Sequence, residues 1–312
     1  MNSIRNYLNS DRNLIIVYKA ELILLFVTLT WGLSFPLIKI ALGSVSPVLF
    51  NFLRFTLTLI LFLIFYRNKL KGFRLQDLKN GLLLGTFLFL GFALQAAGLY
   101  YTTASKSAFI TGTNLIFIPF IQFAVLKTRP KLFNMIGALI VITGLFILSE
   151  SYDLNINTGD ILTLFCAVFF AVHIVFLDKF SRKSDINILI FGQFLVSAVL
   201  SLLFSYFYEY LFMNEFRFTP DATLITAIIY TSVFSTFIGI VLMTKYQRMT
   251  TPLRAGIIYN MESIFAVFFA YIILTEIMNF NQIIGAVIMI SGLLISEFSG
   301  LLKLNTSVGK KN

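Results

Sequence analysis

Ile136-Gly-Ala-Leu-Ile-Val-Ile-Thr-Gly-Leu145 is repeated, with conservative changes, as Ile284-Gly-Ala-Val-Ile-Met-Ile-Ser-Gly-Leu293. The two copies start 148 residues apart, close to half of the 312-residue chain, and each follows a short polar break. A unit that occurs twice predicts a fold built from two related halves. We place these halves at residues 1–150 and 151–312.

The amino-acid composition predicts an integral membrane protein. Hydrophobic residues make up 58% of the chain and charged residues 12%, about half the charged share of a soluble domain. A chain this apolar could not cover its surface with polar groups. The single His and the single Cys exclude a disulfide framework and zinc sites built from several such ligands. We therefore expect no metal and no cofactor.

Ten stretches are long and apolar enough to cross a bilayer, which takes roughly 20 residues. They lie at about 20–41, 47–66, 78–101, 104–126, 132–149, 158–178, 186–208, 222–246, 252–274 and 280–299. Their continuous apolar character favours helices over a barrel. The first stretch is too long for a signal-peptide core, so we count it as a span.

The basic residues are segregated between the predicted spans. Twenty of the 24 fall before the first span, after the last, or in alternate loops. These are Arg5, Arg12, Lys19, Arg67, Lys69, Lys71, Arg74, Lys79, Lys127, Arg129, Lys131, Lys179, Arg182, Lys183, Lys245, Arg248, Arg254, Lys303, Lys310 and Lys311. Since positive loops stay in the cytoplasm, we predict a cell (inner) membrane protein with both termini cytoplasmic. The net charge of +10 is then a topology signal and predicts no nucleic-acid partner.

The loops predicted to be external carry acidic residues instead. They are Glu150, Asp153, Glu209, Glu215, Asp221 and Glu276.

The two copies of the repeated phrase fall in the fifth and tenth spans and so cross the membrane in opposite directions. Weaker similarities occur at a slightly shorter offset, at which Glu21 and Asp160 begin the first and sixth spans and Arg54 corresponds to Gln193. The expected fold is an all-α integral membrane protein with ten transmembrane helices in two inverted five-helix repeats. Such repeats are typical of secondary transporters that work by alternating access.

Several short motifs occur in a characteristic order. They are Trp31-Gly-Leu-Ser-Phe-Pro-Leu-Ile-Lys39, Leu53-Arg-Phe55, Glu262-Ser-Ile-Phe-Ala266, Glu276 and Ile284–Gly292. With this order and spacing, nearly the whole chain resembles an EamA-type member of the drug/metabolite transporter superfamily. The resemblance implies transport of small metabolites, often amino acids or their analogues. It also implies a central cavity lined by spans one, three, four, six, eight and nine. The chain departs from the family at Ser263, where Pro is usual.

Three ionisable residues are candidates for proton coupling or ion pairing. Glu262 lies about ten residues into span nine, roughly 15 Å deep in the membrane. Burial disfavours a charged carboxylate, so Glu262 could bind and release a proton; the alternative is a structural carboxyl group. Arg54, roughly 12 Å below the outer end of span two, is its predicted partner or else extends to the outer surface. His173 is either a proton carrier or a hydrogen-bonded bundle residue.

Spans four and nine each carry a polar stripe. The stripes comprise Ser107, Thr111, Asn114 and Gln122 in span four, and Gly256, Tyr259, Asn260 and Ser263 in span nine. Such stripes contact substrate or join helices. When the two halves are aligned, Thr111 and Asn114 of span four match the apolar residues Ile258 and Met261 of span nine. The two stripes therefore do not superimpose, which predicts that the site is asymmetric or that one stripe only packs against other helices.

The predicted substrate-binding set is completed by residues of spans one and three. Its members are Trp31, Ser34, Gln95, Thr111, Asn114, Tyr259 and Asn260. Packing is the alternative role of each, and Pro36 is expected to bend span one. The glycines of the repeated phrase recur every seven residues, which predicts a flat helix face for close packing.

These features predict a secondary transporter for a small organic metabolite, an amino acid or related compound. The expected partners are that solute, membrane lipid and, with proton coupling as an open option, protons; the expected assembly is a monomer or a homodimer. The chain has no P-loop and no Gly-x-Ser-x-Gly motif, so we predict that it is not an enzyme. The alternative is a non-transporting polytopic membrane protein, such as an enzyme acting on lipid-linked substrates.

Overall fold

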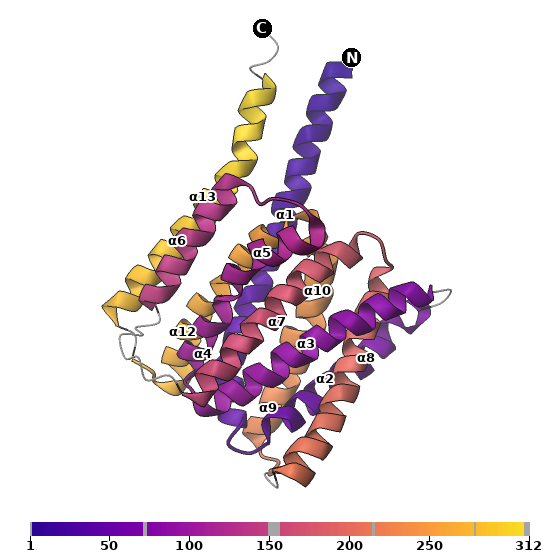
Figure 1. Cartoon of the computed structure of the whole chain (residues 1–312), viewed down its shortest axis with the longest axis vertical. Coiled ribbons are helices and arrows are strands. Elements are labelled where there is room, and N and C mark those ends of the chain that lie inside the picture. Colours follow the sequence, from indigo (N-terminus) through magenta and orange to yellow (C-terminus); the bar gives the residue numbers. More distant parts are fainter. Residues whose placement is uncertain (1, 71–73, 149–156, 214–215, 278, 309–312) are drawn as a thin grey trace.

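The regular structure of the chain is helical. The computed structural model describes residues 2–70, 74–148, 157–213, 216–277 and 279–308, and the side chains of those from 16 to 296. Within these ranges there is no strand, and the only β pairing is an isolated bridge between Val45 and Phe218. Figure 1 shows the helices gathered in one bundle.

The first half contains α1 (Asn2–Ala41), α2 (Pro47–Tyr66), η1 (Arg67–Lys69), α3 (Leu75–Tyr101), α4 (Ala104–Gly112), α5 (Asn114–Leu126) and α6 (Leu132–Leu148). The second half contains α7 (Thr158–Ser181), α8 (Ile186–Phe204), η2 (Ser205–Phe212), α9 (Ala222–Tyr230), η3 (Thr231–Ile238), α10 (Gly239–Tyr246), η4 (Gln247–Met249), α11 (Pro252–Tyr259), α12 (Met261–Leu274) and α13 (Phe280–Val308). Both η2 and η3 are π-helices.

Eight helical stretches of the described chain are long and apolar enough to cross a membrane. Two further apolar helices, Leu132–Leu148 and Phe280–Ser296, are shorter. The protein is therefore a multi-pass membrane protein, but helix length and composition do not establish the predicted number of ten spans. Three of the acidic residues expected outside, Glu150, Asp153 and Glu215, lie outside the described residues, as does the boundary between 150 and 151.

Two of the spans are broken near their middle. Span Ala104–Leu126 consists of α4 and α5, and span Pro252–Leu274 consists of α11 and α12. Each ends at a residue with left-handed backbone, Lys127 (φ 56°) or Thr275 (φ 55°). The separation of these two residues in the sequence equals the offset of the repeated phrase.

The repeated phrase itself forms α6 and α13, which pack side by side at one edge of the bundle (Figure 1). A Cβ atom on Gly137 would lie 2.7 Å from the carbonyl oxygen of Gly292, and one on Gly144 would lie 2.7 Å from that of Gly285. The two copies therefore run antiparallel and touch through glycine faces, backbone against backbone. This packing explains the seven-residue glycine spacing.

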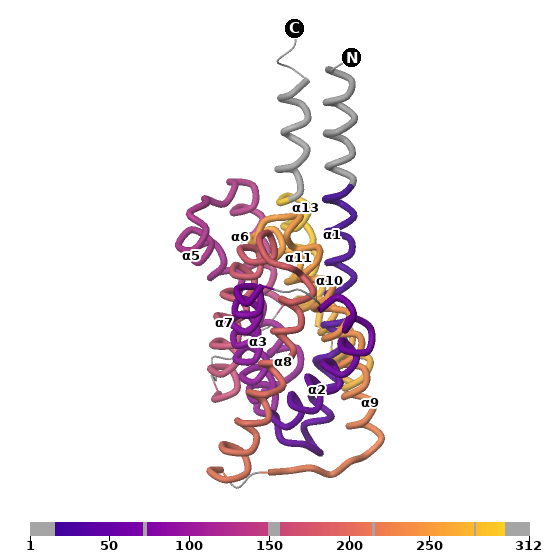
Figure 2. Tube along the Cα trace, turned by 90° about the vertical axis from the view of Figure 1, so that its right-hand side faces the viewer, coloured from indigo at the N-terminus to yellow at the C-terminus, as the bar shows by residue number. Residues whose placement is uncertain are grey.

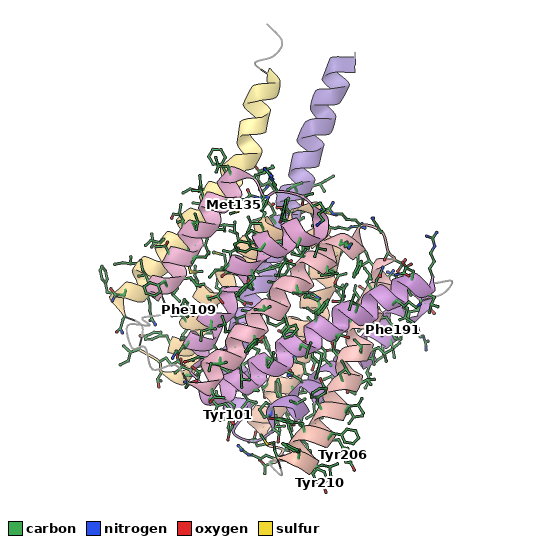
Figure 3. The ribbon with its side chains drawn as sticks, viewed as in Figure 1. Tyr101, Phe109, Met135, Phe191, Tyr206 and Tyr210 are labelled. Carbon is green, nitrogen blue, oxygen red and sulfur yellow. The ribbon has the colours of Figure 1, made fainter. Side chains whose placement is uncertain are left out.

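The bundle has two ends, which we call the terminal face and the opposite face. The terminal face is the end of the bundle from which α1 and α13 lead to the two chain termini, at the top of Figures 1 and 2. Exposed aromatic rings cluster on η2 at the opposite face, including Tyr206 and Tyr210 (Figure 3). Aromatic rings in this position are typical of a membrane–water interface.

An extended segment, residues 216–221, crosses the opposite face between η2 and α9 (Figure 2). The backbone N–H of Ser46 donates to the carbonyl of Arg217 (3.0 Å), and Thr219 donates to Ser44 (2.8 Å). Asp221 ends the segment and caps α9. Hydrogen bonds from the Ser44 hydroxyl and from the Leu224 N–H lower the pKa of the Asp221 carboxyl group.

Candidate functional site

A cavity lies inside the bundle, with about 610 Å³ of empty space when the open solvent at its mouth is included. Its lining residues are Trp31, Ser34, Phe35, Ile38, Arg54, Leu88, Phe92, Gln95, Asn114, Phe170, His173, Ile174, Ser235, Ile240, Met243, Tyr259 and Glu262. They come from the six spans that the family resemblance implies, with Arg54 of the second span in addition.

Most of these residues form pairs related by the two offsets of the repeat. We call the offset from Glu21 to Asp160 the shorter offset, and that from Ile136 to Ile284 the longer offset. The shorter offset relates Trp31 to Phe170, Ser34 to His173 and Phe35 to Ile174. The longer offset relates Phe92 to Ile240, Gln95 to Met243 and Asn114 to Glu262. Corresponding positions of the two halves therefore meet at this cavity, but the paired side chains differ in chemistry, so the two walls are not equivalent.

The predicted alignment of Thr111 and Asn114 with Ile258 and Met261 agrees with the helix starts, because α5 begins at Asn114 and α12 begins at Met261. The C-terminal ends of the same helices, Leu126 and Leu274, are separated by the longer offset, which is one residue greater and pairs Asn114 with Glu262. The correspondence between the two halves therefore changes by one residue within these helices.

Five of the seven predicted substrate-binding residues line the cavity: Trp31, Ser34, Gln95, Asn114 and Tyr259. The indole N–H of Trp31 donates to the carbonyl of Ser235 (2.9 Å), and its ring packs on Tyr259 with centroids 5.3 Å apart. These contacts hold α1 against η3 and α11.

The other two predicted residues, Thr111 and Asn260, lie behind the wall. The amide of Gln95 donates to the Thr111 hydroxyl (3.3 Å), and that of Asn260 donates to Asn114 Oδ1 (3.2 Å). Both are buried and hold a lining side chain in place. Their position predicts a supporting role.

Arg54 is buried in the cavity wall, with 1% of its surface exposed. Its guanidinium group donates to the hydroxyls of Ser235 (2.8 Å) and Thr236 on the π-helix η3, and lies 4.3 Å from the ring centroid of Phe92. The predicted ion pair with Glu262 is not formed among the described residues. Because Arg54 is buried, the alternative that it extends to the outer surface is also wrong.

Glu262 lies in the first turn of α12, at the point where the ninth span is broken. It is 9% exposed, lines the cavity, and makes no hydrogen bond or ion pair within the described chain. The N-terminus of a helix favours an anion. The start of α12 therefore stabilises a negative charge on Glu262, and this charge is available to a molecule bound in the cavity.

His173 shares the cavity wall but is already hydrogen-bonded. Its Nε2 lies 2.8 Å from Oε1 of Gln193, the residue that corresponds to Arg54 at the shorter offset. His173 is therefore in the hydrogen-bonded arrangement that was the alternative to proton transfer.

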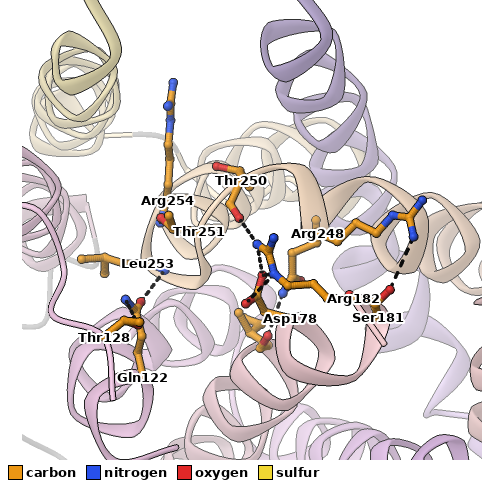
Figure 4. A network of polar contacts seen from close by, with 12 residues as sticks. Gln122, Thr128, Asp178, Ser181, Arg182, Arg248, Thr250, Thr251, Leu253 and Arg254 are labelled. Atoms are coloured by element: carbon orange, nitrogen blue, oxygen red, sulfur yellow. Dashed lines mark hydrogen bonds and ion pairs between the residues drawn. The ribbon is translucent and has the colours of Figure 1, made fainter. Parts of the chain in front are cut away.

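Two further members of the stripes, Ser263 and Gln122, join the broken spans to each other. Ser263 donates to the carbonyl of Ala108 (3.0 Å), and Gln122 accepts from the backbone N–H of Leu253 (3.3 Å; Figure 4). Gly112 leaves room at the crossing, since a Cβ there would lie 2.5 Å from Asn260 Oδ1. Only part of each stripe therefore reaches the cavity.

Two substitutions in α4 and α5 separate support from contact. Thr111→Val should lower the unfolding free energy by about 1 kcal/mol, because Gln95 loses its acceptor, and should leave solute preference unchanged. Asn114→Leu should change the relative transport rates of polar solutes, because it removes a polar group from the wall. Thermal melts and competition transport in vesicles measure the two effects. A changed preference in Thr111→Val would contradict its supporting role.

The apolar half of the lining could not be recognised from its residue types. Leu88, Phe92, Ile240 and Met243 resemble lipid-facing residues, because lipid is as apolar as a protein interior. The repeat does carry a signal: Phe170 and Ile174 are related to Trp31 and Phe35 by the shorter offset, on the matching face of α7.

Comparison with known proteins agrees with a two-part organisation. The sequence model of the EamA-like transporter family matches residues 18–150 and again residues 157–298. The starts of the two matched stretches are separated by the shorter offset and their ends by the longer one, as are the paired residues of the cavity wall.

Whole-length relatives carry transporter names. An uncharacterized transporter of Archaeoglobus fulgidus is 36% identical over 276 residues, covering 88% of this chain and 85% of its own. The uncharacterized transporter YoaV of Bacillus subtilis is 23% identical, covering 90% and 97%. A solved crystal structure, 16% identical, has the same fold with a TM-score of 0.73, covering 91% of this chain and 98% of its own.

Proposed function

Because the chain belongs to the EamA-like transporter family, we propose that this membrane transporter moves an amino acid or a closely related metabolite across the cytoplasmic membrane by alternating access. The observation that carries the proposal is a central cavity with one buried cation, Arg54, and one buried acid, Glu262, that do not pair with each other. An amino acid brings the complementary pair of charges.

The proposed architecture has ten spans in two inverted halves, residues 1–150 and 151–312. The antiparallel contact of α6 and α13 through Gly137, Gly144, Gly285 and Gly292 supports it, because related helices of inverted halves meet in this way. The shorter α6 and α13 then count as the fifth and tenth spans. The distribution of Lys and Arg supports cytoplasmic termini.

In this proposal Arg54 binds the carboxylate of the substrate. A guanidinium group offers two parallel donors that match a carboxylate, and Ser235 and Thr236 already fix the orientation of Arg54. Asn114 at the start of α5 and Glu262 at the start of α12 both line the cavity. Glu262 binds the ammonium group or, when the cavity is empty, a proton. Proton coupling then follows because the substrate ammonium group and a proton bind in turn to the same carboxylate, that of Glu262.

The experiment is a solute panel tested on the full-length protein in vesicles, with and without an imposed proton gradient. Each amino acid is compared with its amide, which lacks the carboxylate, and with its deaminated analogue, which lacks the ammonium group. The intact amino acid should be transported fastest. Equal transport of the neutral amide would contradict the proposed role of the carboxylate.

Arg54→Gln should reduce transport of the best amino acid by roughly 10- to 100-fold, because a hydrogen bond to a charged group contributes about 1.5–3 kcal/mol. The same variant should no longer distinguish the acid from its amide. Lys79→Gln, which removes an exposed positive charge, is the matched control. An unchanged preference for the acid in Arg54→Gln would show that another group binds the carboxylate.

A further inference from the structure

An ion pair between the two halves stands at the terminal face. Arg254 of α11 holds Glu21 of α1 through two contacts, Nε to Oε1 (2.8 Å) and Nη2 to Oε2 (2.9 Å). The hydroxyl of Thr250 also donates to Glu21 (3.1 Å), and the hydroxyl of Thr251 caps the backbone N–H of Arg254 (3.4 Å). These contacts connect Glu21 of α1 to the first turn of α11 and to the residues just before it.

A second ion pair between the halves stands at the opposite face. Lys106 of α4 contacts Asp160 of α7 (2.7 Å). The hydroxyl of Thr102 donates to Asp160 (3.1 Å), and the hydroxyl of Thr103 caps the backbone N–H of Lys106 (3.2 Å). The set of contacts is the same as at the terminal face.

The two clusters correspond residue by residue. The shorter offset relates Glu21 to Asp160, and the longer offset relates Thr102 to Thr250, Thr103 to Thr251, and Lys106 to Arg254. These are the offsets that relate the cavity walls. A contact between half one and half two has therefore been kept twice, once at each face, with the acid and the base contributed by opposite halves.

A cation also covers the same backbone carbonyl in both clusters. Lys39 donates to the carbonyl of Thr102 (2.6 Å), and Arg182 donates to that of Thr250 (3.0 Å) while held by Asp178 (Figure 4). This additional contact joins two helices of the same half in each cluster, since Lys39 and Thr102 belong to the first half and Arg182 and Thr250 to the second.

The cavity lies between the two clusters. Glu21 and Lys39 mark them near the two ends of the apolar span Ile16–Ala41, 18 residues or about 27 Å apart. Trp31 and Ser34, which line the cavity, lie between them on the same helix. A solute that leaves the cavity toward either face along this interface between the halves passes one cluster.

We propose that the Glu21–Arg254 and Asp160–Lys106 pairs are matched gates, and that each must break for the cavity to open to its own face. This inference rests on the proposed alternating access. A rocking motion that separates the halves at one face breaks the pair there and keeps the other. In this structure both pairs are formed.

The two gates differ in strength. The Arg254 gate is bidentate, and its side chains are 10% and 8% exposed. In the Lys106 gate the lysine is 27% exposed. A bidentate pair with both side chains buried is harder to separate than a pair with a partly exposed lysine. The empty transporter therefore opens more often to the opposite face.

The test measures access to the cavity without any substrate. In a Cys166→Ser background, Ser34→Cys provides one thiol in the cavity wall. The full-length protein is placed in vesicles sorted by orientation, and a membrane-impermeant maleimide is added from either face. Lys106→Gln should raise labelling from the opposite face by about 5- to 30-fold and lower it from the terminal face. Arg254→Gln should do the reverse.

The swapped pair Lys106→Asp with Asp160→Lys should restore the labelling pattern of the unmodified gates, and Lys79→Gln should not alter it. Should either Gln variant fail to fold, Asp160→Asn or Glu21→Gln, which breaks the same pair from its acidic side, replaces it. If both Gln variants change labelling in the same direction, or neither changes it, the gates are refuted. If labelling shifts as expected while no panel solute moves, the gates stand and the proposed function fails.

Discussion

Glu262→Gln is expected to reduce amino-acid flux by roughly 10- to 100-fold and to remove its dependence on an imposed proton gradient. Gln has nearly the shape of Glu but cannot carry a negative charge or exchange a proton. Loss of a hydrogen bond between charged groups costs about 1.5–3 kcal/mol, which gives that range. Since Glu262 contacts no cation in the described chain, its charge has no structural partner to lose.

The measurement is initial uptake into vesicles at substrate concentrations below saturation, with and without the gradient. Glu276→Gln is the matched control, because this half-buried carboxyl group accepts a hydrogen bond from Ser105 outside the cavity. Glu262→Asp keeps the charge and should retain gradient dependence at a lower rate. Normal flux with normal gradient dependence in Glu262→Gln would rule out the coupling role and leave a packing role.

The loss of close helix contact should have the largest effect on stability. Gly144→Val is expected to lower the unfolding free energy by about 1–3 kcal/mol or more, the usual cost of overpacking. The new Cβ would lie 2.7 Å from the Gly285 carbonyl oxygen and 2.8 Å from the Met289 nitrogen. Both are backbone atoms of α13, so the axes of α6 and α13 must separate to make room for the valine side chain.

The thermal midpoint of the purified protein in detergent checks this expectation. Leu139→Val is the matched control, since Leu139 is on the same helix but 62% exposed on the outer surface. Gly292→Val should resemble Gly144→Val, because the two glycines occupy corresponding positions. A midpoint equal to that of the control would mean that the glycine faces do not determine the helix separation.

Much of the fold could be predicted because the relevant signals are properties of long segments. Continuous apolar runs predicted a helical membrane protein. The phrase at Ile136 and Ile284 predicted a duplicated organisation, and the family model matches the chain in two stretches. Length alone does not settle whether α6 and α13 are full spans. The helix breaks near Thr113 and Asn260 were not predicted. No Pro directly follows either residue, and neither break has two adjacent glycines to mark it.

The cavity was predictable only where polar side chains stand out against an apolar background. Trp31, Ser34, Gln95 and Asn114 were recognised in this way, and each lines the cavity. Partners within the cavity were harder to predict, because Arg54 binds hydroxyls on a π-helix whose backbone differs from that of an ordinary helix.

The position of Trp31 has a practical consequence. It is the only tryptophan in the chain, and its ring lies in the cavity wall against Tyr259. Its fluorescence therefore originates at one place, the surface that a bound solute would touch. An unlabelled compound that enters the cavity would change the emission of the native protein, so ligands can be screened by fluorescence titration in detergent before any transport assay is built.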